Sequence, residues 1–296
     1  MRSSYSDLIY FLDSKMRLHV YLGPMGLVIT AKNDGVSIFA TERAINRTLS
    51  IAIQTLEDVA RNLDFVTSWC RPIDLSGYPK VVKKMVKSAL IGQELFKERT
   101  TPLISVAGSI SDCVLEELEH EAEHIVVNNY GDIALKVEYA KIGLLDTKGN
   151  LFGVLEVDGT VGGVCTSGFG GRSFSKGIAE ATVCIHESAS LADAFATLVG
   201  NRVVVDSNKI KYEYAENLDP LTDIKGEKIT VGHSGLSKSE IKDAIVNGLT
   251  FAKKAGVTTI IKLDRYVGVY PEKIKKSIKL ERGFNFVTAK SPCETE

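Results

Sequence analysis

Apolar and polar residues alternate over residues 17–39, where the runs LHVYLG, GLVITA and GVSIFA are separated by glycine and Asn-Asp turn signals. Alternation with a period of two, bounded by turn residues, is typical of strands. The first part of the chain therefore predicts short strands joined by tight turns.

The spacing of apolar residues then changes to three and four positions over 42–63, which places them on one face of a helix. Pro79 opens a second helical segment, because proline is tolerated in a first turn. A third helix is predicted over 108–121, where apolar residues recur every four positions.

The middle of the chain predicts mainly strands, in the runs HIVVNN, IALKVEYAKIGLL, NLFGVLEV, GGVCTS and ATVCI. Helices are predicted over 191–200 and near 239–255, the latter announced by the capping-box pair Ser237 and Glu240. The runs VVVDSNKIKYEY and VTTIIKL predict further strands. Helices that alternate with clusters of consecutive strands favour an α+β fold with mostly antiparallel sheets packed with helices. No linker or repeat divides the sequence, so one domain is expected over 1–296.

Composition narrows the class of protein. The 36 basic and 37 acidic residues give a net charge of −1, which argues against a nucleic-acid-binding protein. No apolar stretch reaches 18 residues, and Asp7 and Asp13 interrupt the N-terminal apolar run, so neither a membrane span nor a secretory signal is expected. Five cysteines without a C-x-x-C pair indicate reduced thiols and a cytoplasmic protein.

Asp193 and Thr197 lie four residues apart on a predicted helix, so their oxygens share one face. A carboxylate and a hydroxyl are hard oxygen ligands suited to Mg²⁺, which takes few protein ligands. The alternative is structural: Ser190 and Asp193 have the spacing of an N-cap and its third helical residue.

The glycine-rich stretch 159–177 could bring backbone amides close to a phosphate, with Arg172 as a second donor. A flexible loop between strands explains the same glycines. The stretch NNYGDIAL, which includes Asp132, could present polar groups at a sheet edge, although a turn between strands explains it better.

Two further patterns carry alternative chemistry. The letters HEAEH at 120–124 satisfy the zinc-peptidase motif H-E-x-x-H, but the run LEELEHEAEH is almost continuously acidic, which is typical of a solvated helix end. Cys165 could be a nucleophile, yet no histidine is tied to it by the sequence, so an inert side chain is the expectation.

Four motifs in order resemble those of the ApbE-like proteins, whose best-known members are Mg²⁺-dependent flavin transferases. They are Gly108 with Asp112, Gly131–Asp132, Thr166–Ser167–Gly168, and the helix start ADAFAT that holds Asp193 and Thr197. The segments 106–112, 129–135, 166–181 and 223–244 are most similar to an uncharacterised branch of this superfamily in archaea and bacteria.

The resemblance implies an ApbE-like fold and a metal held by Asp193 and Thr197. It also implies that a small phosphorylated ligand such as FAD or FMN contacts the following residues: Gly108, Asp132, Thr166, Ser167, Gly168, Gly170, Gly171, Arg172 and Ser173. Ala107 stands where the flavin transferases have lysine, and Tyr130 stands where they have glycine. The leading hypothesis is therefore a Mg²⁺- and ligand-binding relative of these enzymes; the rivals are a non-catalytic binding protein and a zinc peptidase.

Overall fold

The computed structural model describes residues 7–287. These residues form two compact units. The first unit contains the described residues of Met1–Ala140, Val157–Cys165 and Ile185–Ala194, and the second unit contains those of Lys141–Glu156, Thr166–Cys184 and Phe195–Glu296.

The first unit contains an antiparallel sheet in the order β1-β2-β3-β5-β6, with the short strand β4 beside β3. Its strands are β1 (Ile9–Leu12), β2 (Leu18–Leu22), β3 (Met25–Asn33), β4 (Val36–Ser37), β5 (His124–Asn129) and the first residues of β6 (Asp132–Leu145). The strands predicted over LHVYLG and GLVITA are confirmed. Of the third predicted strand, GVSIFA, only Val36–Ser37 is a strand, and Ile38–Ala40 forms a 3-10 turn instead. Strand β1 is an additional strand that the sequence pattern does not predict.

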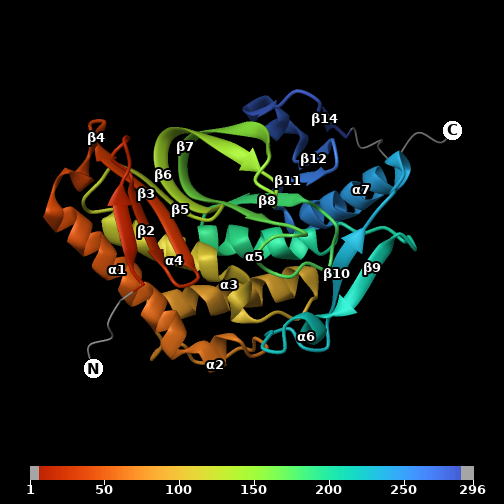
Figure 1. Cartoon of the computed structure of the whole chain (residues 1–296), viewed down its shortest axis with the longest axis horizontal. Helices are drawn as coiled ribbons and strands as arrows, with labels where there is room; N and C mark the ends of the chain where they lie inside the picture. Colours follow the sequence, from red (N-terminus) through yellow and green to blue (C-terminus); the bar gives the residue numbers. More distant parts are fainter. Residues whose placement is uncertain (1–6, 288–296) are drawn as a thin grey trace. The chain divides into compact units, whose positions relative to one another are not determined.

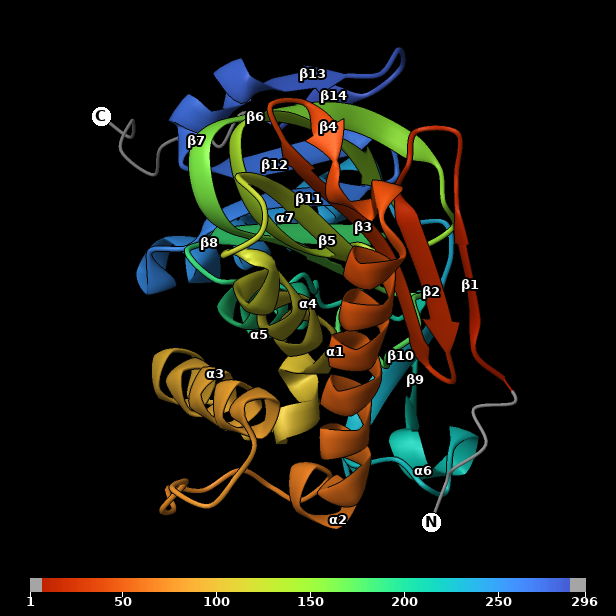
Figure 2. The same cartoon turned by 90° about the vertical axis from the view of Figure 1, so that its left-hand side faces the viewer.

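Four helices and two short 3-10 turns complete the first unit, and Figure 2 shows α1 and α4 beside strands β2, β3 and β5. The elements are α1 (Glu42–Arg61), α2 (Leu63–Val66), α3 (Lys80–Phe96), α4 (Val106–Leu118), and the turns Ile38–Ala40 and Pro102–Ser105. Leu27 and Ile29 of β3 and Val114 of α4 are fully buried and belong to one apolar core. Burial of these faces supplies most of the energy that holds helices on a sheet.

The third predicted helix ends earlier than expected. Helix α4 stops at Leu118, and the backbone N–H groups of Glu121 and Ala122 bond back to the Leu118 carbonyl as a turn. His120 therefore lies in a turn and His124 begins β5, so the two histidines are not one helical turn apart. The geometry of a zinc-peptidase helix is absent at this motif.

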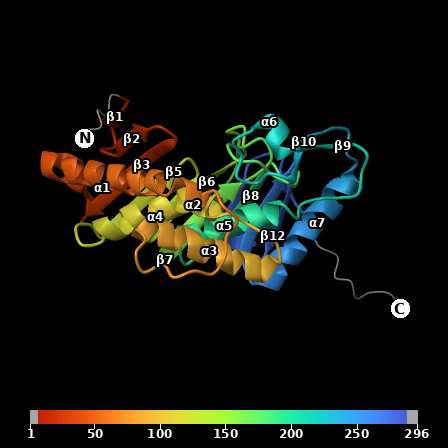
Figure 3. The ribbon, with the colours of Figure 1, turned by 90° about the horizontal axis from the view of Figure 1, so that it is seen from below.

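The second unit contains strands in the order β8-β11-β12-β14, with β13 antiparallel to β7. Strands β9 and β10 form a separate antiparallel pair (Figures 1 and 3). The strands are β7 (Leu151–Ser167), β8 (Ala181–His186), β9 (Ile210–Tyr214), β10 (Lys228–His233), β11 (Thr258–Leu263), β12 (Tyr266–Tyr270), β13 (Ile278–Leu280) and β14 (Asn285–Phe286). The helices are α5 (Ala189–Gly200), α6 (Ala215–Leu218), α7 (Lys238–Ala255) and a 3-10 helix at Glu272–Ser277. Three of these elements belong to the second unit only in part, because residues 157–165 of β7, 185–186 of β8 and 189–194 of α5 belong to the first unit.

Helix α7 packs on β11 and β12, and Ser237 caps its first turn with Glu240 as the sequence predicts. The runs NLFGVLEV and GGVCTS are parts of one strand, β7, and only residues 210–214 of the run VVVDSNKIKYEY form a strand. The predicted α+β fold with mostly antiparallel sheets is confirmed. Among residues 7–287, no helix has the length and apolar character needed to cross a membrane.

Candidate functional site

Asp193 is a buried carboxylate in the first half of α5, with an exposed fraction of 8%. Its Oδ2 accepts a hydrogen bond of 2.9 Å from the backbone N–H of Gly108 on α4. The two helices approach so closely that a Cβ atom on residue 108 would lie 2.3 Å from the Ala189 carbonyl oxygen. Only glycine fits at this position, and its small size brings its N–H to the carboxylate.

The electrostatic environment of Asp193 disfavours its charged form. Burial, and then the nearby negative charges of Asp132 and Asp112, raise the pKa of Asp193 well above its usual range, although the Gly108 N–H acts in the opposite direction. Within the described residues, no Lys, Arg or His forms an ion pair with this carboxylate. A divalent cation would supply the missing positive charge, so the donor set fits a metal.

The first turn of α5 is capped by residues other than Asp193. Ser188 Oγ accepts from the Leu191 N–H at 3.3 Å, and the Asp112 carboxylate accepts from the Ala189 and Ser190 N–H groups at 2.9 and 3.0 Å. Ser190 lies inside the helix, so the alternative role of Asp193 as a capping partner of Ser190 is wrong. Asp193 is thereby left available for another function.

Asp132 follows a two-residue turn between β5 and β6, which confirms the predicted turn. Tyr130 and Gly131 both have positive φ, 55° and 105°, and the Gly131 N–H donates to Asn128 Oδ1 at 2.7 Å. This conformation is typical of a type I′ hairpin turn. The Asp132 carbonyl also accepts from Ser111 Oγ at 2.8 Å, so the hairpin end is fixed to α4.

Tyr130, which replaces a glycine of the flavin transferases, has a structural neighbour that accommodates it. A Cβ atom on residue 26 would lie 2.2 Å from the Tyr130 ring, so the ring packs on the bare backbone of Gly26. Asn129 Oδ1 accepts from the Gly26 N–H at 3.3 Å and fixes the same two segments. The absence of a side chain at Gly26 thus makes room, within the first unit, for the ring of Tyr130.

The predicted phosphate-binding loop lies in the second unit, after Thr166 and Ser167 at the end of β7. The N–H of Phe169 donates to the Ala179 carbonyl at 2.7 Å, and the N–H of Gly171 donates to the Gly168 carbonyl at 3.2 Å. These two amides are therefore engaged by the protein itself, contrary to a loop whose amides all face a ligand. Gly170, Gly171, Arg172 and Ser173 are exposed, whereas Gly168 is buried.

Thr197 belongs to the second unit, where its Oγ1 donates to Ser167 Oγ at 3.3 Å. The structure thus places the predicted residues in two groups. Gly108, Asp132 and Asp193 belong to the first unit, and Thr166–Ser173 with Thr197 belong to the second unit. Helix α5 carries both Asp193 and Thr197. Over residues 7–287, no group of three or more His, Cys, Asp or Glu side chains is arranged to hold a metal ion, so any metal here depends on few side chains.

Cys165 lies near the acidic residues but has the properties of an inert thiol. Burial and the charge of Asp132 raise its pKa well above its usual range, and its Sγ donates to the Ala189 carbonyl at 3.2 Å. A thiol that stays protonated is a poor nucleophile. The other described cysteines are also free thiols, and Cys293 lies outside the described residues.

Sequence reasoning missed a buried ion-pair network behind the loop. Lys262 Nζ lies 3.0 Å from Asp146 Oδ2 and 2.6 Å from Glu180 Oε2, and the side chains of Lys262 and Asp146 are only 7% and 2% exposed. The Thr147 N–H donates to the Glu180 carbonyl at 3.0 Å, and Thr147 Oγ1 donates to the Phe169 carbonyl at 2.7 Å. A lone lysine in the apolar run VTTIIKL was the available signal, because lysine is rarely buried without a partner.

The fold is that of the ApbE-like proteins. The structure matches the flavin transferase ApbE from Vibrio cholerae with a TM-score of 0.53 and 10% sequence identity, covering 91% of this chain and 99% of that one. At this identity the match concerns the fold alone.

Comparison of the sequence with known families identifies a narrower group than the fold does. Residues 9–264 match the family described as AbpE bacteria, and the chain belongs to this family. It is 34% identical over 178 residues to a UPF0280 protein of Methanococcus maripaludis, which covers 54% of this chain and 67% of the relative. It is 31% identical over 194 residues to a UPF0280 protein of Methanosphaera stadtmanae, covering 61% and 76% of the two chains. The predicted resemblance is confirmed.

Proposed function

We propose that the chain binds a small phosphorylated ligand, of the flavin-nucleotide class that includes FAD and FMN, together with Mg²⁺. The carboxylate of Asp193 carries this proposal. It is buried beside the negative charge of Asp132, and within residues 7–287 its one hydrogen bond comes from the Gly108 N–H. Such a carboxylate is costly without a counter-charge, and a metal supplies one.

Asp193 and Thr197 are the proposed protein ligands of the metal. They lie four residues apart on α5, so the helix itself sets their spacing. Mg²⁺ is commonly bound through one or two protein oxygens, with waters and substrate phosphates completing its shell. Two ligands therefore suffice when a phosphorylated ligand is present.

The phosphate contacts are assigned to the end of β7 and the loop after it. Because the Phe169 and Gly171 amides are engaged by carbonyl groups, the assignment falls on Arg172 and on the hydroxyls of Thr166, Ser167 and Ser173. Arginine binds phosphate oxygens in a bidentate manner. Arg172 is the residue of this loop whose charge an anionic ligand needs.

The proposed chemistry is transfer of a phosphoryl or nucleotidyl group. With FAD, an acceptor hydroxyl would release its proton to solvent and attack the FMN phosphorus, the pyrophosphate bond would break, and AMP would leave with the electron pair. A metal held by Asp193 and Thr197 would supply positive charge to offset the negative charge that develops on the leaving AMP. A second candidate is ligand binding without turnover, which is favoured by Ala107 in place of the flavin-transferase lysine.

Binding is tested by thermal unfolding with FAD, FMN or ATP, each with and without Mg²⁺. A ligand at 100 times its Kd stabilises a protein by about 2.7 kcal/mol, so a clear rise of Tm is expected only when metal and ligand are both present. The variant Asp193→Asn should lose the Mg²⁺-dependent part of this rise. The exposed Asp34, changed to Asn, is the matched control and should respond like the wild type. Equal responses of the wild type and Asp193→Asn would refute the metal assignment.

Turnover is tested by incubating the purified protein with FAD and Mg²⁺ and following the products by mass spectrometry. Release of AMP, with an FMN adduct on an added acceptor, identifies a transferase. Mg²⁺-dependent binding without AMP release over a long incubation identifies the binding protein.

A further inference from the structure

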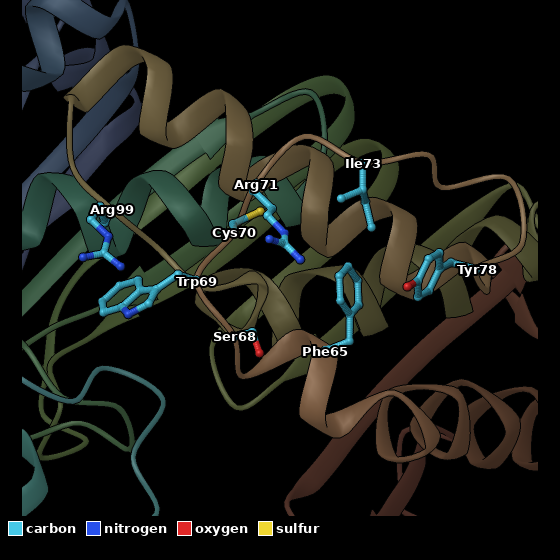
Figure 4. Close-up of a pocket in the computed structure, with 8 residues that line it drawn as sticks. All are labelled: Phe65, Ser68, Trp69, Cys70, Arg71, Ile73, Tyr78 and Arg99. Atoms are coloured by element: carbon cyan, nitrogen blue, oxygen red, sulfur yellow. The ribbon is translucent and has the colours of Figure 1, made fainter.

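We propose a second ligand site in the first unit, separate from the metal site, which binds a planar aromatic anion. The site is a pocket of about 670 Å³ between α2, α3 and the segments that precede α3 and α4 (Figure 4). This volume lies within the range of small-molecule sites. Nothing in the proposed function above requires this pocket.

The pocket is lined by aromatic rings and by two arginines. The Phe65 and Tyr78 rings stack at a centroid distance of 4.7 Å, and the Arg99 guanidinium lies 4.2 Å from the centre of the Trp69 ring. Figure 4 shows the guanidinium of Arg71 pointing toward the Phe65 ring. Flat rings and guanidinium planes both bind a flat ligand on its faces.

The charge of the lining is entirely positive. Neither Asp nor Glu is among the eight residues that line the pocket. Cys70 contributes no negative charge, because burial raises its pKa to about 11. Across the part of the chain that the structure describes, Arg71 and Arg99 have no carboxylate within ion-pair distance. Two guanidinium groups without anionic partners favour a carboxylate or a phosphate.

The walls of the pocket are fixed in place before any ligand arrives. The Cys70 N–H donates to the Thr100 carbonyl at 2.8 Å, which joins the segment of Trp69 to that of Arg99. Gln93 of α3 ties both segments, since its Nε2 donates to the Cys70 carbonyl and its Oε1 accepts from the Thr100 N–H. A preformed pocket loses little conformational entropy on binding.

Trp69 makes the site directly observable, because it is the only tryptophan of the chain. Its fluorescence, excited at a wavelength where adenine and pyridine rings do not absorb, reports on this pocket alone. The probes are AMP, an aromatic phosphate, and nicotinate, an aromatic carboxylate. Adenosine and nicotinamide are their uncharged counterparts, and inorganic phosphate supplies the charge without the ring.

We expect AMP, nicotinate or both to quench Trp69 in a saturable manner, with a Kd at least tenfold lower than that of the uncharged counterpart. The stronger of the two then tells a phosphate site from a carboxylate site. The variants Arg71→Gln and Arg99→Gln should each raise this Kd about tenfold or more. Arg265→Gln is the matched control, since Arg265 is exposed and lies outside the pocket, and its Kd should not change. Circular dichroism verifies that each variant is folded.

Quenching that rises linearly with concentration, or that is equal for charged and uncharged probes, would overturn the proposal. The same titration in Asp193→Asn without Mg²⁺ keeps the two sites apart. An unchanged Kd in that variant supports an independent pocket, even where the metal assignment fails. A loss of quenching there would show that the pocket belongs to the metal site and would refute a separate one.

Discussion

Two buried carboxylates of this protein have pKa values that are shifted in opposite directions. Counted over all atoms of each residue, Asp146 and Asp193 are 7% and 8% exposed. Burial would raise the pKa of Asp146, but hydrogen bonds from the Asn150 N–H and from Lys262 outweigh it and lower that pKa. Burial raises the pKa of Asp193, and the negative charges of its acidic neighbours Asp132 and Asp112 raise it further. Burial alone therefore does not set the direction of a carboxylate's pKa shift; the charge of the neighbouring groups decides it.

The two groups consequently affect stability with opposite signs as the pH changes. A lowered pKa means that Asp146 stabilises the fold above the pKa of the unfolded chain, and that this contribution is lost as pH falls through the folded-state value. A raised pKa means that Asp193 destabilises the metal-free fold as pH rises above the unfolded value near 3.8. A bound cation would remove this penalty.

The largest effect is expected when the compensated carboxylate loses its partner. Lys262→Met leaves Asp146 and Glu180 without their cation, and breaking a buried pair costs about 3–5 kcal/mol in the free energy of unfolding. Urea denaturation measures this loss. Lys141→Met is the control, because its pair with Glu156 is exposed on both sides and exposed pairs contribute about 0–1 kcal/mol. Equal losses in both variants would contradict the network's importance.

The next effect tests the contact that positions Asp193. Gly108→Ala places a Cβ atom against the Ala189 carbonyl, so α4 or α5 must shift, at a cost of about 1–3 kcal/mol in the free energy of unfolding. Gly77→Ala is the control, since its Cβ would meet no atom within 4 Å, and it should change stability by less than about 0.5 kcal/mol. Similar denaturation midpoints for the two variants would show that the structure has room for a Cβ atom at residue 108.

Lys262→Met and Gly108→Ala lie in different units, so together they test the expectation of a single domain. One domain predicts a single calorimetric transition in the wild type, which both variants shift to lower temperature. Two separate transitions, each sensitive to one variant, would instead identify two domains.

Asp193→Asn should raise the free energy of unfolding, whereas the two variants above lower it. The neutral amide can still accept from the Gly108 N–H and carries no charge, so the metal-free variant should be more stable than the wild type at pH 7. The difference should disappear below about pH 4, where the carboxyl group is protonated in both states. Chemical denaturation at both pH values measures it, and a variant less stable at pH 7 would contradict an uncompensated Asp193.

The smallest effect concerns Glu240, a carboxylate near the surface that already accepts hydrogen bonds from the protein. Hydrogen bonds from Lys209 and the Ser237 N–H lower the pKa of Glu240 to about 2. Ser237→Ala removes the reciprocal half of this capping box and should lower the free energy of unfolding by about 1 kcal/mol. Ser239→Ala, two residues later at the second position of the helix, should have a smaller effect. A larger loss of stability in Ser239→Ala than in Ser237→Ala would show that Ser237 is not the N-cap of α7.

Local patterns were predictable from the sequence, and long-range pairings were not. The helix over 42–63, the capping box at Ser237 and the turn at Tyr130–Gly131 each depend on residues a few positions apart. The sequence also identified Asp193, because its spacing to Thr197 is local. The partner of Asp193, the N–H of Gly108, lies 85 residues away, and no local pattern shows that it meets the carboxylate.

The same limit explains what was missed. Lys262 meets Asp146 across 116 residues of chain, so an apolar strand with one lysine was visible but its partners were not. Asp112 was recognised as part of a family motif, while its contact with the start of α5 depends on tertiary packing. The pocket around Trp69 required two loop segments to be brought together.

The contact between Asp112 and α5 also limits where a nucleotide can lie. The first amides of a helix commonly attract phosphate, but here the carboxylate occupies them as a built-in mimic of that anion. A pyrophosphate arriving at this helix would have to displace a side chain that is already neutralising the positive end of its dipole. Under the proposed function, the ligand would therefore draw its donors from Arg172 and the hydroxyl groups beside it.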